Sequence, residues 1–177
     1  MLITKEKLYD LRVGINELEF FILHYKPMKI EEYLKDVIKY RQQIAAKYKE
    51  DAYLWCYWLI AKSISRKATV KFALFAALQV DFERDDKLKQ SLMTAKAYLD
   101  YPSRKARETA WRYVAEEGSL DPTVVSVDSA VKTAAKAGGY YTAYQAAMNA
   151  VHANPKAKNA ILEFGIKLIQ EEEEQKC

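Results

Sequence analysis

Residues 51–82 read DAYLWCYWLIAKSISRKATVKFALFAALQVDF and contain two strongly apolar runs separated by a single polar break. The first run begins at Ala52 and stops at Lys62, well short of the ~20 uninterrupted apolar residues that a membrane span needs. The second run, Phe72–Leu78, is apolar on every side of a helix, which is typical of a helix surrounded by others. Ser65 suits the N-cap between them. We therefore predict two central helices, over 52–64 and 66–82.

The composition of the whole chain indicates an all-α protein. Its 177 residues suit one domain, and only five glycines and four prolines interrupt it. Alanine, leucine, lysine and glutamate dominate, while alternating β-branched runs are scarce. We predict a single-domain bundle of about eight helices over residues 1–170, followed by a solvated acidic tail over 171–177. The flanking helices are expected over 5–12 (ended by Gly14), 16–25, 30–48, 85–101, 104–117, from Asp121–Pro122 onward, and after Asn154–Pro155.

The segment 127–151 has the most regular apolar spacing in the chain. Steps of three and four residues indicate an a/d seam that could support homo-oligomerisation. Gly138–Gly139 interrupts the seam, and because two adjacent glycines cost about 2 kcal/mol relative to alanine in a helix interior, we expect a split or a kink there. The seam consists of Val127, Ala130, Ala134, Ala137, Tyr141, Tyr144, Met148 and Val151.

Charge and cysteine content point to a cytoplasmic protein with no membrane segment. The net charge is +4 although Glu171–Glu174 concentrates acid at one end, so the remainder is more basic. A basic body attracts acidic partners, although interleaved lysines and glutamates also suit a plain solvated helix surface. Cys56 and Cys177 cannot form a disulfide framework, and Met1–Arg12 mixes charges without the apolar core of a signal peptide.

Catalytic and cofactor motifs are not found in the sequence. His24 and His152 are the only histidines, and neither has a second ligand at zinc spacing. Neither GxGxxG nor GxxxxGK[ST] occurs, and each pair of adjacent carboxylates falls at an expected helix end or polar face, where capping and solvation explain it. We therefore expect no enzyme activity, no metal and no cofactor.

Aromatic and basic residues supply the candidate partner-binding sites. Thirteen tyrosines and three tryptophans exceed what a core requires, and these residue types dominate interface hot spots. An equally good interpretation places the tyrosines at the boundary of the core, with their hydroxyl groups hydrogen-bonded to water. An alternative function is nucleic-acid binding by the basic helix 104–112, although Glu108 dilutes its charge. The candidates are Arg104, Arg107, Trp111, Tyr140, Tyr141 and Tyr144.

The middle of the chain resembles a helical family of immunity proteins that occurs beside bacterial polymorphic toxins and in phage genomes. The resemblance covers about residues 51–151. Where the family commonly has a proline and several arginines in a turn, this chain has Asp85–Lys89, and its helical repeats lack the family's histidines. The matching features are Trp55 and Trp58 in a W-x-x-W-like helix, the F-A-x-F-A-A-x-x-V run Phe72–Val80, A-K-x-Y-L at Ala95–Leu99, and the alanine- and tyrosine-rich part Ala130–Val151.

The resemblance implies an inhibitor that works by sequestering another protein. The expected partner is a bacterial toxin or a host factor. Because the matching positions are mostly packing residues, the resemblance does not identify the target.

Overall fold

The computed structural model describes residues 1–82, 85–114, 119–135 and 139–175. Within these ranges the chain forms eleven α-helices, one short 3-10 helix and one antiparallel pair of two-residue strands, which confirms the predicted all-α class. The elements are β1 (Leu2–Ile3), α1 (Lys5–Asp10), α2 (Ile15–His24), β2 (Met28–Lys29), α3 (Ile30–Lys39), α4 (Arg41–Tyr48), α5 (Ala52–Ser63), α6 (Arg66–Ala77), α7 (Asp86–Asp100), α8 (Arg104–Arg112), α9 (Pro122–Ala135), α10 (Tyr140–Ala153), η1 (Pro155–Ala157) and α11 (Lys158–Glu174).

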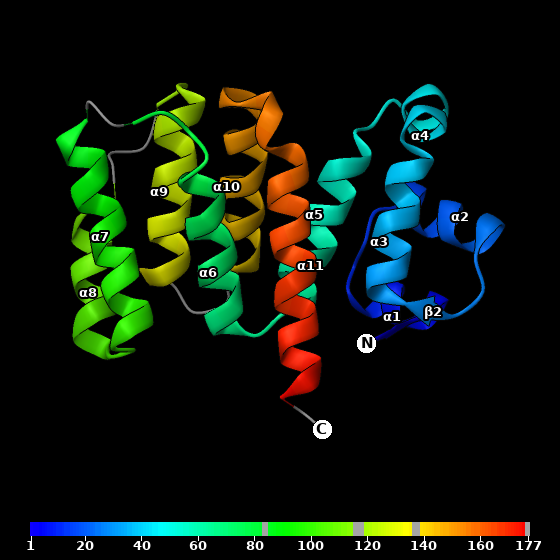
Figure 1. Cartoon of the computed structure of the whole chain (residues 1–177), viewed down its shortest axis with the longest axis horizontal. Helices are drawn as coiled ribbons and strands as arrows, with labels where there is room; N and C mark the ends of the chain where they lie inside the picture. The colour runs from blue at the N-terminus through cyan, green and yellow to red at the C-terminus, as the bar shows by residue number, and fades with distance from the viewer. Residues whose placement is uncertain (83–84, 115–118, 136–138, 176–177) are drawn as a thin grey trace.

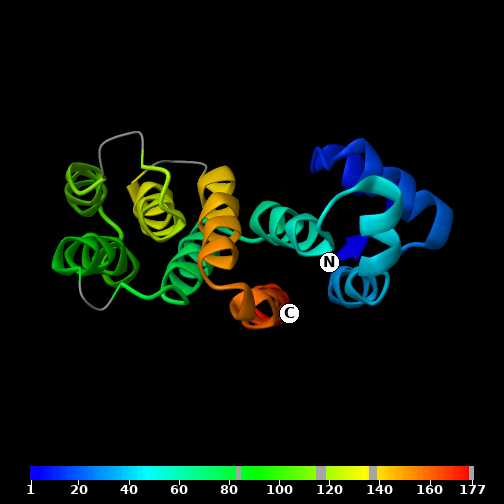
Figure 2. The ribbon, with the colours of Figure 1, turned by 90° about the horizontal axis from the view of Figure 1, so that it is seen from above.

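The helices form an elongated row with α5 as the connection between its two parts. Helices α1–α4 gather at one end, α7 and α8 lie at the other, and α6, α9, α10 and α11 fill the middle (Figures 1 and 2). Helix α5 contacts α3 and α4 on one side and α10 and α11 on the other. One cluster of buried apolar residues runs from Ile3 through α5 to Ile169.

The two central helices begin where the sequence indicates. The Asp51 carboxylate accepts the Tyr53 N–H at 2.9 Å at the start of α5, and the Ser65 hydroxyl accepts the Ala68 N–H at 3.4 Å at the start of α6. Most side chains of α5 are buried, as its composition predicts. Helix α6, however, ends at Ala77 and not at residue 82.

One face of α6 is uncovered, which the sequence did not indicate. Phe72 is completely buried, whereas Phe75 is only partly buried and Leu78 has 58% of its surface exposed. Phe75 stacks on Phe164 of α11 with ring centroids 4.1 Å apart. The expectation of a helix surrounded on all sides is therefore wrong for the face that carries Phe75 and Leu78.

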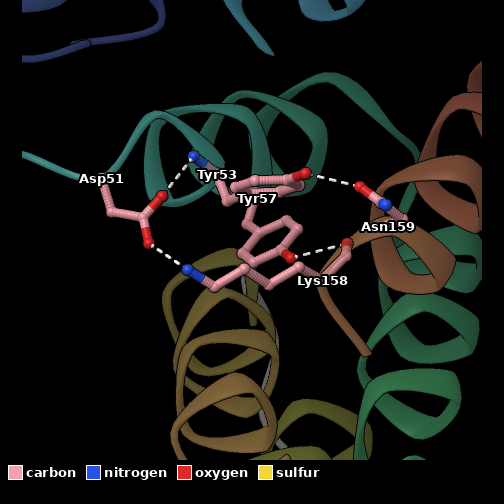
Figure 3. A network of polar contacts seen from close by, with 5 residues as sticks. All are labelled: Asp51, Tyr53, Tyr57, Lys158 and Asn159. Atoms are coloured by element: carbon pink, nitrogen blue, oxygen red, sulfur yellow. Dashed lines mark hydrogen bonds and ion pairs between the residues drawn. The ribbon is translucent and has the colours of Figure 1, made fainter. Parts of the chain in front are cut away.

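Polar contacts fix α11 against α5 (Figure 3). The Tyr57 hydroxyl donates to the Lys158 carbonyl at 2.9 Å, and the Tyr53 hydroxyl donates to the Asn159 side chain. The Lys158 ammonium pairs with Asp51 at 2.7 Å, so the N-cap of α5 also binds the start of α11. Because Tyr57 is buried, its hydroxyl needs the carbonyl partner that α11 provides.

The N-terminal helices differ from the sequence prediction at two points. Residues 30–48 form two helices, α3 and α4, because the backbone turns at Tyr40; beyond the turn Ile44 is fully buried and α4 packs on α5. Gly14 does not end a helix in the left-handed region: its φ is −62° and it begins α2, whereas Arg12 has the positive φ of 52°.

The acidic end of the chain is helical as far as Glu174. The Glu172 carboxylate accepts the Ser65 N–H at 2.9 and 3.0 Å, which satisfies a backbone donor at the start of α6. Residues 171–174 therefore continue α11, with Glu171, Glu172 and Glu173 half-buried and Glu174 exposed, while residues 176–177 lie outside the described ranges.

Helices α9 and α10 form an antiparallel hairpin. Helix α9 ends at Ala135 and α10 begins at Tyr140, so the segment is split as predicted, although Ala137 and Gly138 lie outside the described ranges. The Ser126 hydroxyl donates to the Ala146 carbonyl at 2.9 Å, and four alanines of α10 are completely buried. These are Ala143, Ala146, Ala147 and Ala150.

Burial within the chain contradicts a continuous oligomer seam over 127–151. Val127, Ala130 and Ala134 are completely buried by other helices of the same chain, whereas Tyr141 is exposed. The a/d spacing therefore records packing between neighbouring helices in its first half. In the part of the chain that the structure describes, no helix is long and apolar enough to cross a membrane.

Gly165 of α11 lies against Ile60 of α5 and Phe72 of α6, and it provides a test of the fold. A Cβ there would lie 2.6 Å from Ile60 Cδ1, 2.9 Å from Ile60 Cγ2 and 3.0 Å from Phe72 Cε2. Because Ile60 and Phe72 are completely buried, we expect Gly165→Ala to lower the free energy of unfolding by about 1–3 kcal/mol. In a helix interior, replacement of glycine by alanine ordinarily raises the free energy of unfolding, so the expected change has the opposite sign.

Urea denaturation measures this change, with Gln170→Ala as the control. Gln170 lies on the exposed side of the same helix, so its replacement is expected to stay within about 0.5 kcal/mol of the parent. A more stable Gly165→Ala protein would show that α11 does not approach α5 and α6 this closely.

Candidate functional site

Trp58 of α5 is the centre of an aromatic cluster on the surface. Three tyrosines of α10 meet its ring edge-on: the centroid distances are 5.6 Å to Tyr140, 6.3 Å to Tyr141 and 5.4 Å to Tyr144. Trp58 and Tyr144 are partly buried, while Tyr140 and Tyr141 have 38% and 53% of their surface exposed. We call Trp58, Tyr140, Tyr141 and Tyr144 the aromatic rim. Edge-to-face contacts of this kind hold rings in fixed orientations.

Lys62 adds a positive charge to the aromatic rim. It lies one turn after Trp58 on α5, and its ammonium lies 3.7 Å from the centroid of Tyr140 and 5.1 Å from that of Trp58. Both distances fall within the range of a cation–π interaction. The rim is therefore aromatic with a basic edge.

A cavity of about 540 Å³ opens beside the aromatic rim, between α5, α10 and the start of α2. Trp58 and Tyr144 belong to both the rim and the cavity wall. The remaining wall combines apolar side chains with charges of both signs, so the cavity can accept an aromatic or aliphatic group and still hydrogen-bond to it. These other lining residues are Arg12, Gly14, Glu17, Lys49, Glu50, Asp51, Leu54 and Trp55.

Glu17 is the buried acid of the cavity. Only 6% of its surface is exposed, and its carboxylate accepts the Gly14 N–H at 2.9 Å, which positions it in the first turn of α2. Burial raises the pKa of Glu17 to about 8, and the negative charge of Glu50 adds to the rise while the Gly14 hydrogen bond opposes it. The Glu17 carboxyl group is therefore largely protonated at neutral pH.

Glu50 holds the loop that closes the cavity. Its carboxylate accepts the indole N–H of Trp55 and the side-chain N–H of Asn16, the latter at 2.7 Å. The preceding residue, Lys49, has a left-handed φ of 59°, which turns the chain between α4 and α5. These contacts connect α2, the loop and α5 around one opening.

Tyr144 joins the aromatic rim to the acids of the cavity. Partial burial raises the pKa of its hydroxyl above the ordinary value, and the charges of Glu17, Glu50 and Asp51 add to the rise. The Tyr144 hydroxyl therefore stays protonated and can donate a hydrogen bond to a ligand in the cavity.

The structure brings together only some of the six predicted site residues. Tyr140, Tyr141 and Tyr144 meet on Trp58, but Arg104, Arg107 and Trp111 lie on α8, beyond α9 in the row of helices (Figure 1). The α8 residues line a separate hollow of about 620 Å³ together with Glu108, Arg112 and Ala135. The six candidate residues therefore lie on two separate surfaces of the protein.

The α8 surface is basic but partly neutralised. Arg104 pairs with Glu108 at 2.7 Å, as expected for residues four apart on a helix. Trp111 has 49% of its surface exposed beside Arg107 and Arg112 in the same hollow. Arg107, Arg112 and Trp111 line this hollow beside the Arg104–Glu108 pair.

Sequence reasoning missed Trp58, Lys62 and Glu17 as members of the site. Trp58 was assigned to the core because it lies in an apolar run, and only its contacts with a helix more than eighty residues later reveal it. For Glu17 a signal existed: a glutamate three residues after an N-cap often turns back to the cap N–H, as in a capping box. That signal predicts the hydrogen bond, not the burial.

A metal centre is not supported within the described ranges, where no group of three His, Cys, Asp or Glu residues is placed to hold an ion. His24 contacts the Phe20 carbonyl through Nδ1 at 2.8 Å, and its ring lies tilted by 31° against the Phe20 ring. Comparisons with protein-family models, with curated proteins and with solved structures find no match to the chain.

The raised pKa of Glu17 predicts a pH-dependent stability. The unfolded chain loses this proton near pH 4.5, whereas the folded protein keeps it up to about pH 8. The contribution of Glu17 to the free energy of unfolding is therefore complete below pH 4.5 and is lost as the pH rises to about 8. Within this window the free energy of unfolding falls by at most about 1.4 kcal/mol per pH unit. Across this window Glu17→Gln should become progressively more stable than the parent.

Chemical denaturation of both proteins at several pH values between about 5 and 8 measures the difference. Glu19→Gln is the matched control on the same helix: Glu19 is exposed, and its pKa is lowered by Lys47, so this variant should not gain stability with pH. A gap between Glu17→Gln and the parent that stays constant with pH would contradict the assignment.

Proposed function

We propose that this chain is a non-enzymatic protein-binding domain that inhibits another protein by sequestering it. The observation that carries the proposal is the aromatic rim beside the 540 Å³ cavity, where three tyrosines and one tryptophan from two helices form one surface. Tyrosine and tryptophan dominate interface hot spots because they bury large areas with few rotatable bonds. A pocket beside such residues can receive an anchoring side chain of the partner.

The immunity-like part of the proposal is supported by the sequence resemblance. Trp58 and the segment containing Tyr140, Tyr141 and Tyr144 fall within the part of the chain that resembles the immunity proteins. The proposed partner is accordingly a bacterial toxin or a host factor in the cytoplasm. Rigid positioning of the rings on packed helices favours stoichiometric binding, because little side-chain freedom is lost on association.

Nucleic-acid binding by α8 remains the second candidate. The supporting observation is that Arg107, Arg112 and the half-exposed Trp111 line one hollow, an arrangement in which a base can stack on the indole while arginines contact phosphate. The two functions use different faces and are therefore separable by mutation.

Tyr141→Ala is the variant that tests the protein-binding proposal. Tyr141 is the most exposed member of the rim, so its truncation should leave the fold intact while removing about 2 kcal/mol or more of binding energy, a loss of affinity of about thirtyfold. Partners captured from bacterial lysate by the parent chain are identified by mass spectrometry, and their affinities for each variant are then measured by calorimetry.

Tyr101→Ala is the matched control, because Tyr101 is also exposed but follows α7, away from the rim. It should bind like the parent. In a parallel mobility-shift titration, tight binding of single-stranded DNA or RNA that Arg107→Ala/Arg112→Ala abolishes and Tyr141→Ala leaves unchanged would reject the protein-binding proposal in favour of the second candidate.

A further inference from the structure

A second surface, distinct from the aromatic rim, is an apolar groove on the uncovered face of α6. Its cavity volume is about 540 Å³, and its floor comes from α6, α7, α11 and the connection after α6. Two floor residues are unusually exposed for their type: Leu78 at 58% and Met93 at 69%. The floor consists of Leu74, Phe75, Leu78, Phe82, Leu92, Met93, Leu99 and Phe164.

The groove has the shape of a helix-binding site. Arg66 at the start of α6 donates to Tyr98 near the end of α7 at 3.0 Å, so the two helices run antiparallel. The lining residues of α7 lie between Lys89 and Leu99 at steps of three and four, which gives a straight stripe of about 15 Å at 1.5 Å per residue. Three turns of a partner helix would fit along it, with apolar residues at i, i+3, i+4 and i+7.

The charged residues along the two edges of the groove are all positive. Lys71 lies on the α6 edge and Lys89 and Lys96 lie on the α7 edge, and the lining residues that the structure describes include no aspartate or glutamate. Lys89 has an exposed ion-pair partner, Asp86, at 3.1 Å, which solvent screens. A partner should therefore be apolar on the face that enters the groove and acidic on its flanks.

We propose that this groove binds an acidic amphipathic helix of a partner protein. The floor satisfies the apolar face of such a helix, and the lysines on the two edges satisfy its carboxylates. A second copy of the same groove is disfavoured because it would oppose lysine with lysine. A fatty acid offers one carboxylate, whereas Lys89 and Lys96 are two turns apart and suit carboxylates repeated along a helix.

The groove also explains the composition of α6. A helix that is apolar on all sides is ordinarily buried on all sides. Helix α6 contacts α7, α9, α10 and α11, but on one face Phe75 is only partly covered, by Phe164, and Leu78 is 58% exposed. A bound amphipathic helix would complete its burial.

The test uses a fluorescein-labelled synthetic peptide of about 18 residues, long enough to be partly helical. Leucines occupy its i, i+3, i+4 and i+7 positions and glutamates most of the others; a matched peptide has lysines in place of the glutamates. Fluorescence anisotropy should show saturable binding of the acidic peptide to the parent protein, at least about tenfold tighter than binding of the lysine peptide. The higher affinity should decline with added salt because the lysines are exposed.

Two variants and one charge-matched control locate the binding. Met93→Glu puts a negative charge in the floor at an exposed position, and Lys96→Glu reverses one edge charge; each should weaken binding of the acidic peptide by about tenfold or more. Lys87→Glu makes the same charge change on an exposed part of α7 that does not line the groove, so it should match the parent apart from a small long-range effect. Thermal melts verify that all variants fold.

Several results would overturn the proposal. These are no saturable binding of the acidic peptide, equal binding of both peptides, or equal losses in Lys96→Glu and Lys87→Glu. Displacement of the peptide by stoichiometric oleate, with oleate binding tighter than the peptide, would assign the groove to a fatty acid instead. Tyr141→Ala should bind the peptide like the parent, so failure here leaves the function proposed for the aromatic rim separately testable.

Discussion

The burial of α5 on two sides is the constraint on which the rest of the structure depends. One side of this helix receives α3 and α4, and the other receives α10 and α11. The hydrogen bonds of Tyr53 and Tyr57 to the start of α11, with the Lys158–Asp51 ion pair, fix the direction in which α11 leaves η1. Gly165 then allows α11 to approach Ile60 and Phe72 closely. Because α5 also carries Trp58, the packing that stabilises the fold positions the aromatic rim.

The sequence predicted those parts of the fold that depend on local chemistry. The all-α class, the cap at Ser65 and the start of α9 at Pro122 follow from residues next to each other in the chain, and all are observed. The bend at Tyr40 could not be predicted, because the apolar pattern continues through it and only packing of Ile44 against distant helices requires it. The a/d spacing of 127–151 was correct as periodicity but did not identify which neighbour it contacts.

The candidate site shows the same division. Tyrosine abundance predicted an aromatic surface, and the three named tyrosines do meet on Trp58. Trp58 and the buried Glu17, however, belong to the site only through contacts between distant segments. The opposite error occurred at α6, where an apolar run suggested complete burial. An apolar run in the sequence indicates that a helix face is to be buried, but it does not indicate whether the residues that bury it belong to the same chain.

The buried alanines of α10 have a consequence for conformational entropy. Ala143, Ala146, Ala147 and Ala150 are completely buried, and an alanine side chain has no rotamers to lose when it is fixed. Burying these four positions therefore costs backbone freedom but no side-chain entropy. Since α9 and α10 are also neighbours in sequence, the loop that joins them closes with a small entropic penalty. The surface that presents Tyr140, Tyr141 and Tyr144 is thus supported by a helix whose buried alanines lose no side-chain entropy when the helix orders, which suits the binding role proposed for that surface.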